Sequence, residues 1–161
     1  MSDYYNRPGG VAADGTPTYA IAADTEAESR VDRIVEAAWG CTVHKLPPLS
    51  PIDRYIEKDG RLVAYLEIKT RTHQADRFPD VWLNHRKYMA LLNMHLAVGV
   101  ATVFVVQFTD QIRWVDVSHL TPGSLRMGGT RRLVKSDTDR EPMVKVMVAD
   151  MHQLEYVEVP L

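Results

Sequence analysis

Asp53, Glu67 and Lys69 stand close together in this sequence, and two carboxylates beside an amine can hold a divalent cation and handle a proton. Carboxylate oxygens suit Mg²⁺ or Mn²⁺, which keep water in their remaining coordination positions and bind phosphate oxygens readily. A cation held there would polarise a phosphodiester and offset charge on the leaving oxygen, while Lys69 holds or helps to activate the attacking water. These residue types therefore indicate metal-dependent phosphodiester hydrolysis.

A β-hairpin is predicted to bring the three residues together. Asp59-Gly60 separates two runs of strand-forming residues, and Asp-Gly is a strong hairpin signal because both residues tolerate positive φ. Side chains alternate along a strand, so Glu67 and Lys69 share one face, and Asp53 reaches that face from the preceding strand. The structural alternative is a charged edge strand that discourages aggregation.

This pattern resembles the PD-(D/E)XK nuclease superfamily, with Asp53 at its aspartate and Glu67-Ile68-Lys69 at its E-x-K. The sequence departs in one place, because Ile52 separates Pro51 from Asp53, whereas the family's proline usually abuts the aspartate. That proline binds no metal. The departure therefore makes the match to the motif weaker, but it removes no residue that metal binding needs. The resemblance implies metal binding by Asp53, Glu67 and the Ile68 carbonyl. It also implies that Lys69 holds or helps to activate the attacking water.

Two roles are possible for Glu28. In enzymes of this superfamily a glutamate on the first helix often joins the metal site, and Glu28 matches it by its position before the helix-ending Gly40. Alternatively, Thr25 and Glu28 satisfy the T-x-x-E capping box, which would turn the carboxylate back onto the helix start. Both readings stay open. The neighbouring Asp32 and Glu36 are predicted to face the solvent.

Hydrophobic periodicity and turn residues predict the elements that carry these groups. Asn84 is expected to cap a helix that Gly99 ends, with Leu96 among its inward residues. The nearly unbroken apolar run at residues 100–108 is typical of a central strand covered on both faces. The remaining predictions are a helix at 25–39, strands at 41–46, 112–117 and 142–148, and a helical turn at 151–156.

This order predicts an α/β fold with a mixed central sheet flanked by helices. The resemblance implies a restriction-endonuclease-like core in the order αβββαβ. Residues 1–23 are rich in Gly, Ala and Pro without periodicity, which predicts a flexible tail. Residues 24–161 are then expected to form a single nuclease-like domain with a C-terminal basic loop and an extra strand, since a chain of 161 residues suits one core.

The composition and motifs of the chain indicate where in the cell the protein acts and which cofactors it does not use. No apolar segment approaches transmembrane length, and the single cysteine, Cys41, cannot form an internal disulfide. A cytoplasmic location is therefore expected, which for a phage-encoded protein is the host cytoplasm. The chain has no P-loop and no G-x-G-x-x-G motif, so no nucleotide cofactor is expected.

Charge is distributed unevenly along the chain despite a net charge of only −2. Residues 1–40 hold three basic and seven acidic side chains, whereas residues 118–136 hold four Lys or Arg and no acid. Basic groups at a helix start gain from an incoming phosphate, so DNA is the expected partner. The predicted DNA contacts are Arg71, Lys87, Arg86, Arg54, Arg131 and Arg132.

The function expected from these features is that of a Mg²⁺- or Mn²⁺-dependent DNA endonuclease. The resemblance favours structure-specific or weakly sequence-specific cutting, as in Holliday junction resolvases and phage nucleases of DNA repair and recombination. Cutting two strands needs two sites, which favours a homodimer or a higher homo-oligomer. The alternatives are an exonuclease of the same superfamily and a catalytically inactive subunit that binds or recruits DNA.

Overall fold

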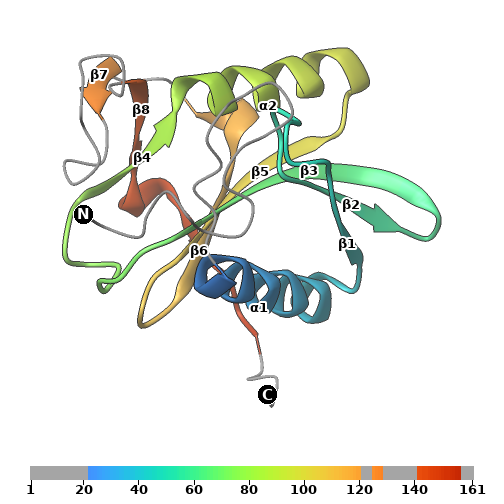
Figure 1. Cartoon of the computed structure of the whole chain (residues 1–161), viewed down its shortest axis with the longest axis horizontal. Coiled ribbons are helices and arrows are strands. Elements are labelled where there is room, and N and C mark those ends of the chain that lie inside the picture. The colour runs from blue at the N-terminus through green and yellow to red at the C-terminus, as the bar shows by residue number, and fades with distance from the viewer. Residues whose placement is uncertain (1–21, 121–124, 129–140, 157–161) are drawn as a thin grey trace.

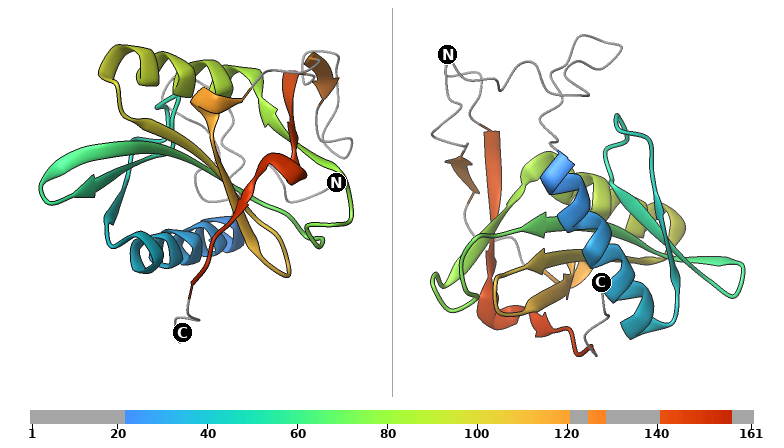
Figure 2. Two further views of the ribbon diagram at one scale, coloured as in Figure 1. Left: turned by 180° about the vertical axis from the view of Figure 1, so that it is seen from behind. Right: turned by 60° about the horizontal axis from the view of Figure 1, so that its bottom comes forward.

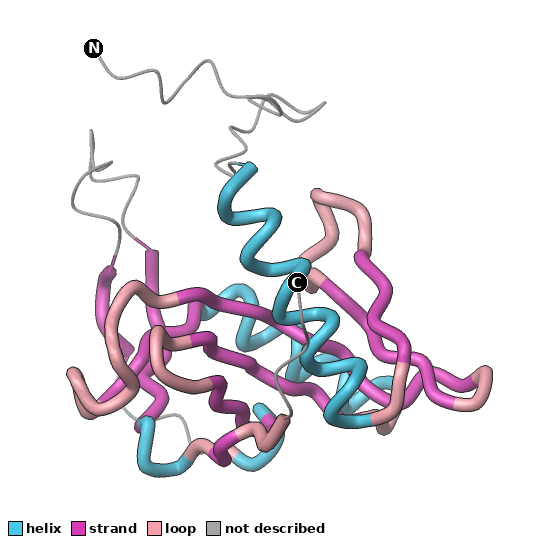
Figure 3. Tube along the Cα trace, turned by 90° about the horizontal axis from the view of Figure 1, so that it is seen from below, coloured by secondary structure: helices cyan, strands magenta, loops and turns pink. Residues whose placement is uncertain are grey.

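The computed structural model describes residues 22–120, 125–128 and 141–156. In this part of the chain a six-stranded sheet, in the order β1-β2-β3-β5-β6-β9, lies between helices α1 and α2 (Figure 1). The two further views in Figure 2 show that the helices cover opposite faces of the sheet. Seen from below, α1 crosses the strands (Figure 3). The predicted mixed α/β architecture is therefore confirmed.

The helices are α1 (Ala22–Trp39) and α2 (His85–Val98). The strands are β1 (Thr42–Lys45), β2 (Arg54–Lys58), β3 (Arg61–Thr70), β4 (Asp80–Asn84), β5 (Ala101–Gln107), β6 (Ile112–Asp116), β7 (Leu125–Gly128), β8 (Glu141–Met147) and β9 (His152–Gln153). Short 3₁₀ turns follow β6 and β8, at η2 (Val117–His119) and η4 (Val148–Asp150).

The β2–β3 hairpin turns at the predicted dipeptide. Asp59 has φ 52° and Gly60 has φ 72°, which is the left-handed pair of conformations that a tight two-residue hairpin needs. The pairing then shifts by one residue at a bulge between Ile56 and Glu57. Because side chains alternate across a sheet, this bulge decides which residues of β2 share a face with those of β3.

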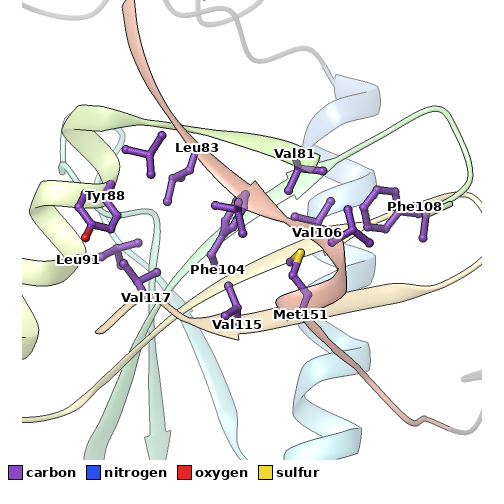
Figure 4. Packing of buried hydrophobic residues seen from close by; sticks show 14 of the residues in the cluster. Val81, Leu83, Tyr88, Leu91, Phe104, Val106, Phe108, Val115, Val117 and Met151 are labelled. Atoms are coloured by element: carbon purple, nitrogen blue, oxygen red, sulfur yellow. The ribbon is translucent and has the colours of Figure 1, made fainter. Parts of the chain in front are cut away.

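β3 and β5 form the parallel centre of the sheet, and the chain between them passes through β4 and α2. Successive residues of β5 point to opposite faces of the sheet and therefore belong to different cores. Val103 and Val105 pack in the cluster that includes α1. Phe104 and Val106 pack on the other face, in the cluster that includes α2 (Figure 4). Burial on both faces confirms the central strand expected from the apolar run.

A second sheet, which was not predicted from the sequence, packs on the α2 side. Its three strands lie in the order β4-β8-β7 and are all antiparallel. Val81 and Leu83 of β4 join Val144 and Val146 of β8 in the same buried cluster as Phe104. β4 is thus inserted between the third strand and the second helix of the predicted αβββαβ order, and β8 overlaps the strand predicted at 142–148.

Three local predictions are wrong. α1 begins at Ala22, so Thr25 lies inside the helix and cannot cap it. The helical turn predicted at 151–156 is instead the short strand β9, which pairs with the edge of β6. Leu96, predicted to face inward, is 75 % exposed near the end of α2. The predicted tail, apart from residues 22 and 23, lies outside the described residues.

Candidate active site

Asp53 and Glu67 lie opposite each other because of the hairpin register. Arg54 pairs with Leu66, and the same antiparallel register continued by one residue puts Asp53 opposite Glu67. The bulge at Ile56 and Glu57 is needed for this pairing, because a shift of one residue would place Asp53 across from Leu66. The sheet thus brings the two predicted carboxylates together on the face that α2 covers.

Lys87 on the first turn of α2 completes this group. The Asn84 side chain accepts a hydrogen bond from the Arg86 backbone N–H at 2.7 Å and so starts the helix as predicted. Lys87 Nζ then forms an ion pair with Asp53 Oδ1 and lies 3.1 Å from Glu67 Oε2. A residue predicted to contact DNA therefore lies between the two carboxylates.

Glu67 is the most perturbed group of the site. Its side chain is 8 % exposed. Burial, followed by the charge of Asp53, raises the pKa of Glu67 to about 8, and Lys87 offsets part of this rise. Glu67 Oε2 forms an ion pair with Lys87 Nζ at 3.1 Å but accepts no hydrogen bond in the described structure. The site therefore contains a buried acceptor atom without a hydrogen-bond donor.

Lys69 lies two residues after Glu67 on β3 and so shares its face of the sheet. Burial, followed by the charge of Arg71, lowers the pKa of Lys69. No ion pair forms at its amine within the residues that the structure describes. An amine with a lowered pKa is more readily neutral near pH 7, and a neutral amine can accept a proton.

The donor set fits a hard divalent cation. Glu67 Oε2 is buried without a hydrogen bond, and Asp53 supplies a second carboxylate opposite it. No group of three or more His, Cys, Asp or Glu side chains with metal-binding spacing occurs in residues 22–120, 125–128 and 141–156. Mg²⁺ does not need one, since it often binds through one or two carboxylates and keeps several waters.

Glu28 and Arg54 lie on the opposite face of the sheet. Arg54, 3 % exposed, donates from Nε to Asp32 Oδ1 at 2.7 Å and from Nη2 to Glu28 Oε2 at 3.0 Å. A guanidinium held this way cannot reach DNA without breaking both ion pairs, so Arg54 is a structural residue rather than the predicted DNA contact. Asp32, predicted to face solvent, is instead buried.

The other predicted DNA contacts differ in their surroundings. Arg86 is exposed on the first turn of α2. Arg71 is partly buried, its guanidinium donates to the Thr70 carbonyl at 3.2 Å, and burial lowers its pKa. Arg131 and Arg132 lie outside the described residues. Of these residues, Arg71 directly follows β3, which carries Glu67, and Arg86 directly precedes Lys87 on α2.

The place of Lys87 and the partners of Arg54 were not predicted from the sequence. The signal for Lys87 was a cation three residues after a strong helix cap, where it opposes the helix dipole and needs a nearby anion. No comparable signal marks Arg54, because this residue is on β2 and its partners, Asp32 and Glu28, are far away in the sequence on α1. No helix in the described residues is long and apolar enough to cross a membrane.

Similarity to known proteins was sought both in sequence and in structure. A search of the curated proteins found no significant match. Among solved structures, the chain is similar to Hjc, a Holliday junction resolvase from the archaeal hyperthermophile Archaeoglobus fulgidus. The match has a TM-score of 0.49 and 13% identity, and covers 76% of this chain and 87% of that chain. A similarity at this level does not assign a substrate.

A sequence family matches nearly the whole chain. The match runs over residues 15–154, and so includes both helices and every strand described above. The family is described as "Phage putative PDDEXK endonuclease", and the matched range includes Asp53 and Glu67-Ile68-Lys69. The chain therefore belongs to this phage PD-(D/E)XK endonuclease family.

Proposed function

We propose that this protein is a metal-dependent DNA endonuclease whose site consists of Asp53, Glu67 and Lys69. The observation that carries the proposal is the buried Glu67 carboxylate, which faces Asp53 and has an oxygen without a hydrogen bond. Two facing carboxylates that share one ammonium, with one of them buried, are rarely kept for stability, because desolvation of their charges is costly. Strongly perturbed acids in such a setting are characteristic of functional sites.

Asp53, Glu67 and the Ile68 carbonyl would hold Mg²⁺ or Mn²⁺. When bound, the cation supplies charge that polarises the scissile phosphate and stabilises the leaving oxygen. Lys69 is placed two residues along the same strand face and has a lowered pKa. Its amine orients the attacking water and accepts its proton. The water attacks in line with the leaving oxygen, and no covalent enzyme intermediate forms.

DNA is the proposed substrate. Arg71 directly follows β3, which carries Glu67, and Arg86 directly precedes Lys87 on α2, and each would contact the phosphate backbone without reading sequence. Two helices and two sheets build the cores, with no separate recognition module among the described residues, which favours structure-specific or weakly sequence-specific cutting. Two such sites are needed to cut two strands, so a homodimer is proposed, acting in the cytoplasm of the phage host. Glu28 is not included among the metal ligands, because its carboxylate is paired with Arg54.

The test is cleavage of labelled linear duplex, single strand, flap and four-way junction in Mg²⁺, Mn²⁺, Ca²⁺ or EDTA. Wild type is compared with Glu67→Ala and Lys69→Ala. Glu57→Ala is the matched control, because it removes a carboxylate of the same hairpin that lies outside the site. Metal-dependent products should fall about a hundredfold or more in both site variants and stay unchanged in the control.

The substrate panel also separates the alternatives. Internal cuts in the duplex or junction support the endonuclease, whereas stepwise loss of end nucleotides identifies an exonuclease. DNA binding without cutting under every metal contradicts the enzyme and identifies a DNA-binding subunit.

A further inference from the structure

Lys87 occupies the position between two carboxylates where a cation is expected. Its ammonium pairs with Asp53 Oδ1 and lies 3.1 Å from Glu67 Oε2. The three side chains are 28 %, 27 % and 8 % exposed for Lys87, Asp53 and Glu67, so water screens this contact only in part. In the absence of a metal, Lys87 is the group that neutralises the pair.

We propose that Lys87 is a built-in counter-ion that a divalent cation must displace, and that the released ammonium then binds the phosphate backbone of DNA. This inference rests on the proposed function, because it takes Asp53 and Glu67 as the metal ligands. An ammonium and a divalent cation cannot share the same two carboxylates, because the two positive charges would lie within a few ångströms of each other. Metal binding and the Lys87 ion pairs are therefore alternatives.

The positive charges around the start of α2 determine which group the released ammonium binds. Lys87 stands on the first turn of α2, where the positive end of the helix dipole disfavours a cation. Arg71 adds positive charge nearby, and both its charge and that of Lys87 lower the pKa of Lys69. Once the carboxylates are engaged by metal, this region has excess positive charge. Its natural partner is a phosphate, and the flexible stem of lysine lets the ammonium reach it.

Coupling between metal and DNA follows from this arrangement. Without DNA, metal binding leaves Lys87 with no partner, so the cation binds weakly. With DNA present, a phosphate receives Lys87 and metal binding becomes easier. Because such coupling is reciprocal, metal should tighten DNA binding by the same factor. Lys87 would thus keep the site largely empty until substrate arrives.

The experiment is calorimetric titration of the full chain with Mn²⁺ alone, for wild type, Lys87→Gln and Lys145→Gln. Lys145 is the matched control, because it also pairs with a carboxylate, Asp80 at 3.5 Å, but lies on the second sheet. Lys87→Gln should bind Mn²⁺ about tenfold more tightly than wild type, within the usual range of such couplings. Lys145→Gln should match wild type.

The titration is repeated with Ca²⁺ and a short duplex, where the DNA-induced gain in affinity should shrink in Lys87→Gln. Equal or weaker Mn²⁺ binding by folded Lys87→Gln overturns the inference and leaves the proposed function intact. Absence of Mn²⁺ binding to wild type and variant alike overturns the proposed function, and the inference with it.

A measurement on wild type alone covers the case in which Lys87→Gln does not fold. An amine-reactive label read by mass spectrometry should modify Lys87 faster when saturating Mn²⁺ is present, because the amine has been released. Labelling of Lys145 should not change. Lys87 labelling that stays constant under saturating Mn²⁺ contradicts the displacement.

Discussion

Arg54 Nε lies 2.7 Å from Asp32 Oδ1, in an ion pair buried on the sheet face opposite to Asp53. Residues 53 and 54 are neighbours, so this pair anchors the start of β2 to α1 while the adjacent carboxylate faces α2. The position of Asp53 in the site is therefore coupled to a structural contact on the other side of the sheet.

Replacing Arg54 by Met should destabilise the protein by about 3 kcal/mol, because it leaves two carboxylates without their cation, one of them buried. Urea unfolding measures the loss. Arg33→Met is the control, since Arg33 is exposed on α1, and it should change stability by less than about 0.5 kcal/mol. A loss no larger than that in Arg54→Met would contradict the structural role.

Replacing Glu28 by Gln should leave Mn²⁺ affinity and the cleavage rate near wild type. Glu28 is one-third exposed and pairs with Arg54, so the change should cost no more than about 1 kcal/mol of stability. Calorimetry and a cleavage time course check both points. A large loss of metal affinity in folded Glu28→Gln would show instead that the carboxylate leaves Arg54 to bind metal.

The stability of the metal-free protein should fall as pH rises from 4.5, the ordinary pKa of a Glu side chain, to about 8, the pKa of Glu67 in the folded state. Across this window the folded protein holds a proton at Glu67 that the unfolded chain has released, so rising pH favours unfolding. Melting temperatures in EDTA, taken as the difference between wild type and Glu67→Gln, isolate this contribution. A difference that does not vary with pH would contradict the raised pKa.

Replacing Thr102 by Val should raise stability by about 1 kcal/mol. Thr102 is fully buried, and its hydroxyl oxygen has no hydrogen-bond partner in the described structure. Removing an unsatisfied hydroxyl while keeping the shape of the side chain avoids its desolvation cost. Urea unfolding measures the change, with the exposed Thr109→Val as control. A clear loss of stability would mean that the hydroxyl has a partner.

Local signals in the sequence predict the elements that carry the site. The turn at Asp59-Gly60 follows from two residues that accept positive φ, and the ends of α2 follow from Asn84 and Gly99. The alternation of side chains along β3 is enough to place Glu67 and Lys69 on one face. Each of these features depends on residues close together in the sequence.

Contacts between distant segments are not predictable in the same way. Arg54 meets Asp32 across 22 residues, and Lys87 meets Asp53 across 34. Which charges meet depends on how α1 and α2 dock on the sheet, and periodicity alone leaves that docking open. The second sheet was missed for the same reason, since Val81 of β4 pairs with Val146 of β8.

The central claim is that Asp53 and Glu67 form the centre of a metal-dependent nuclease. Single-turnover cleavage of labelled DNA in Mg²⁺ tests it most directly, with DNA binding measured in parallel for wild type, Asp53→Asn and Asp59→Asn. Asp59 is exposed at the hairpin turn with positive φ, which Asn tolerates, so this variant removes a nearby charge without touching the site. Asp53→Asn should keep DNA binding and lose about a hundredfold or more in rate, while Asp59→Asn cuts normally. Wild-type cleavage by Asp53→Asn, or DNA binding without metal-dependent cleavage by wild type, would contradict the claim.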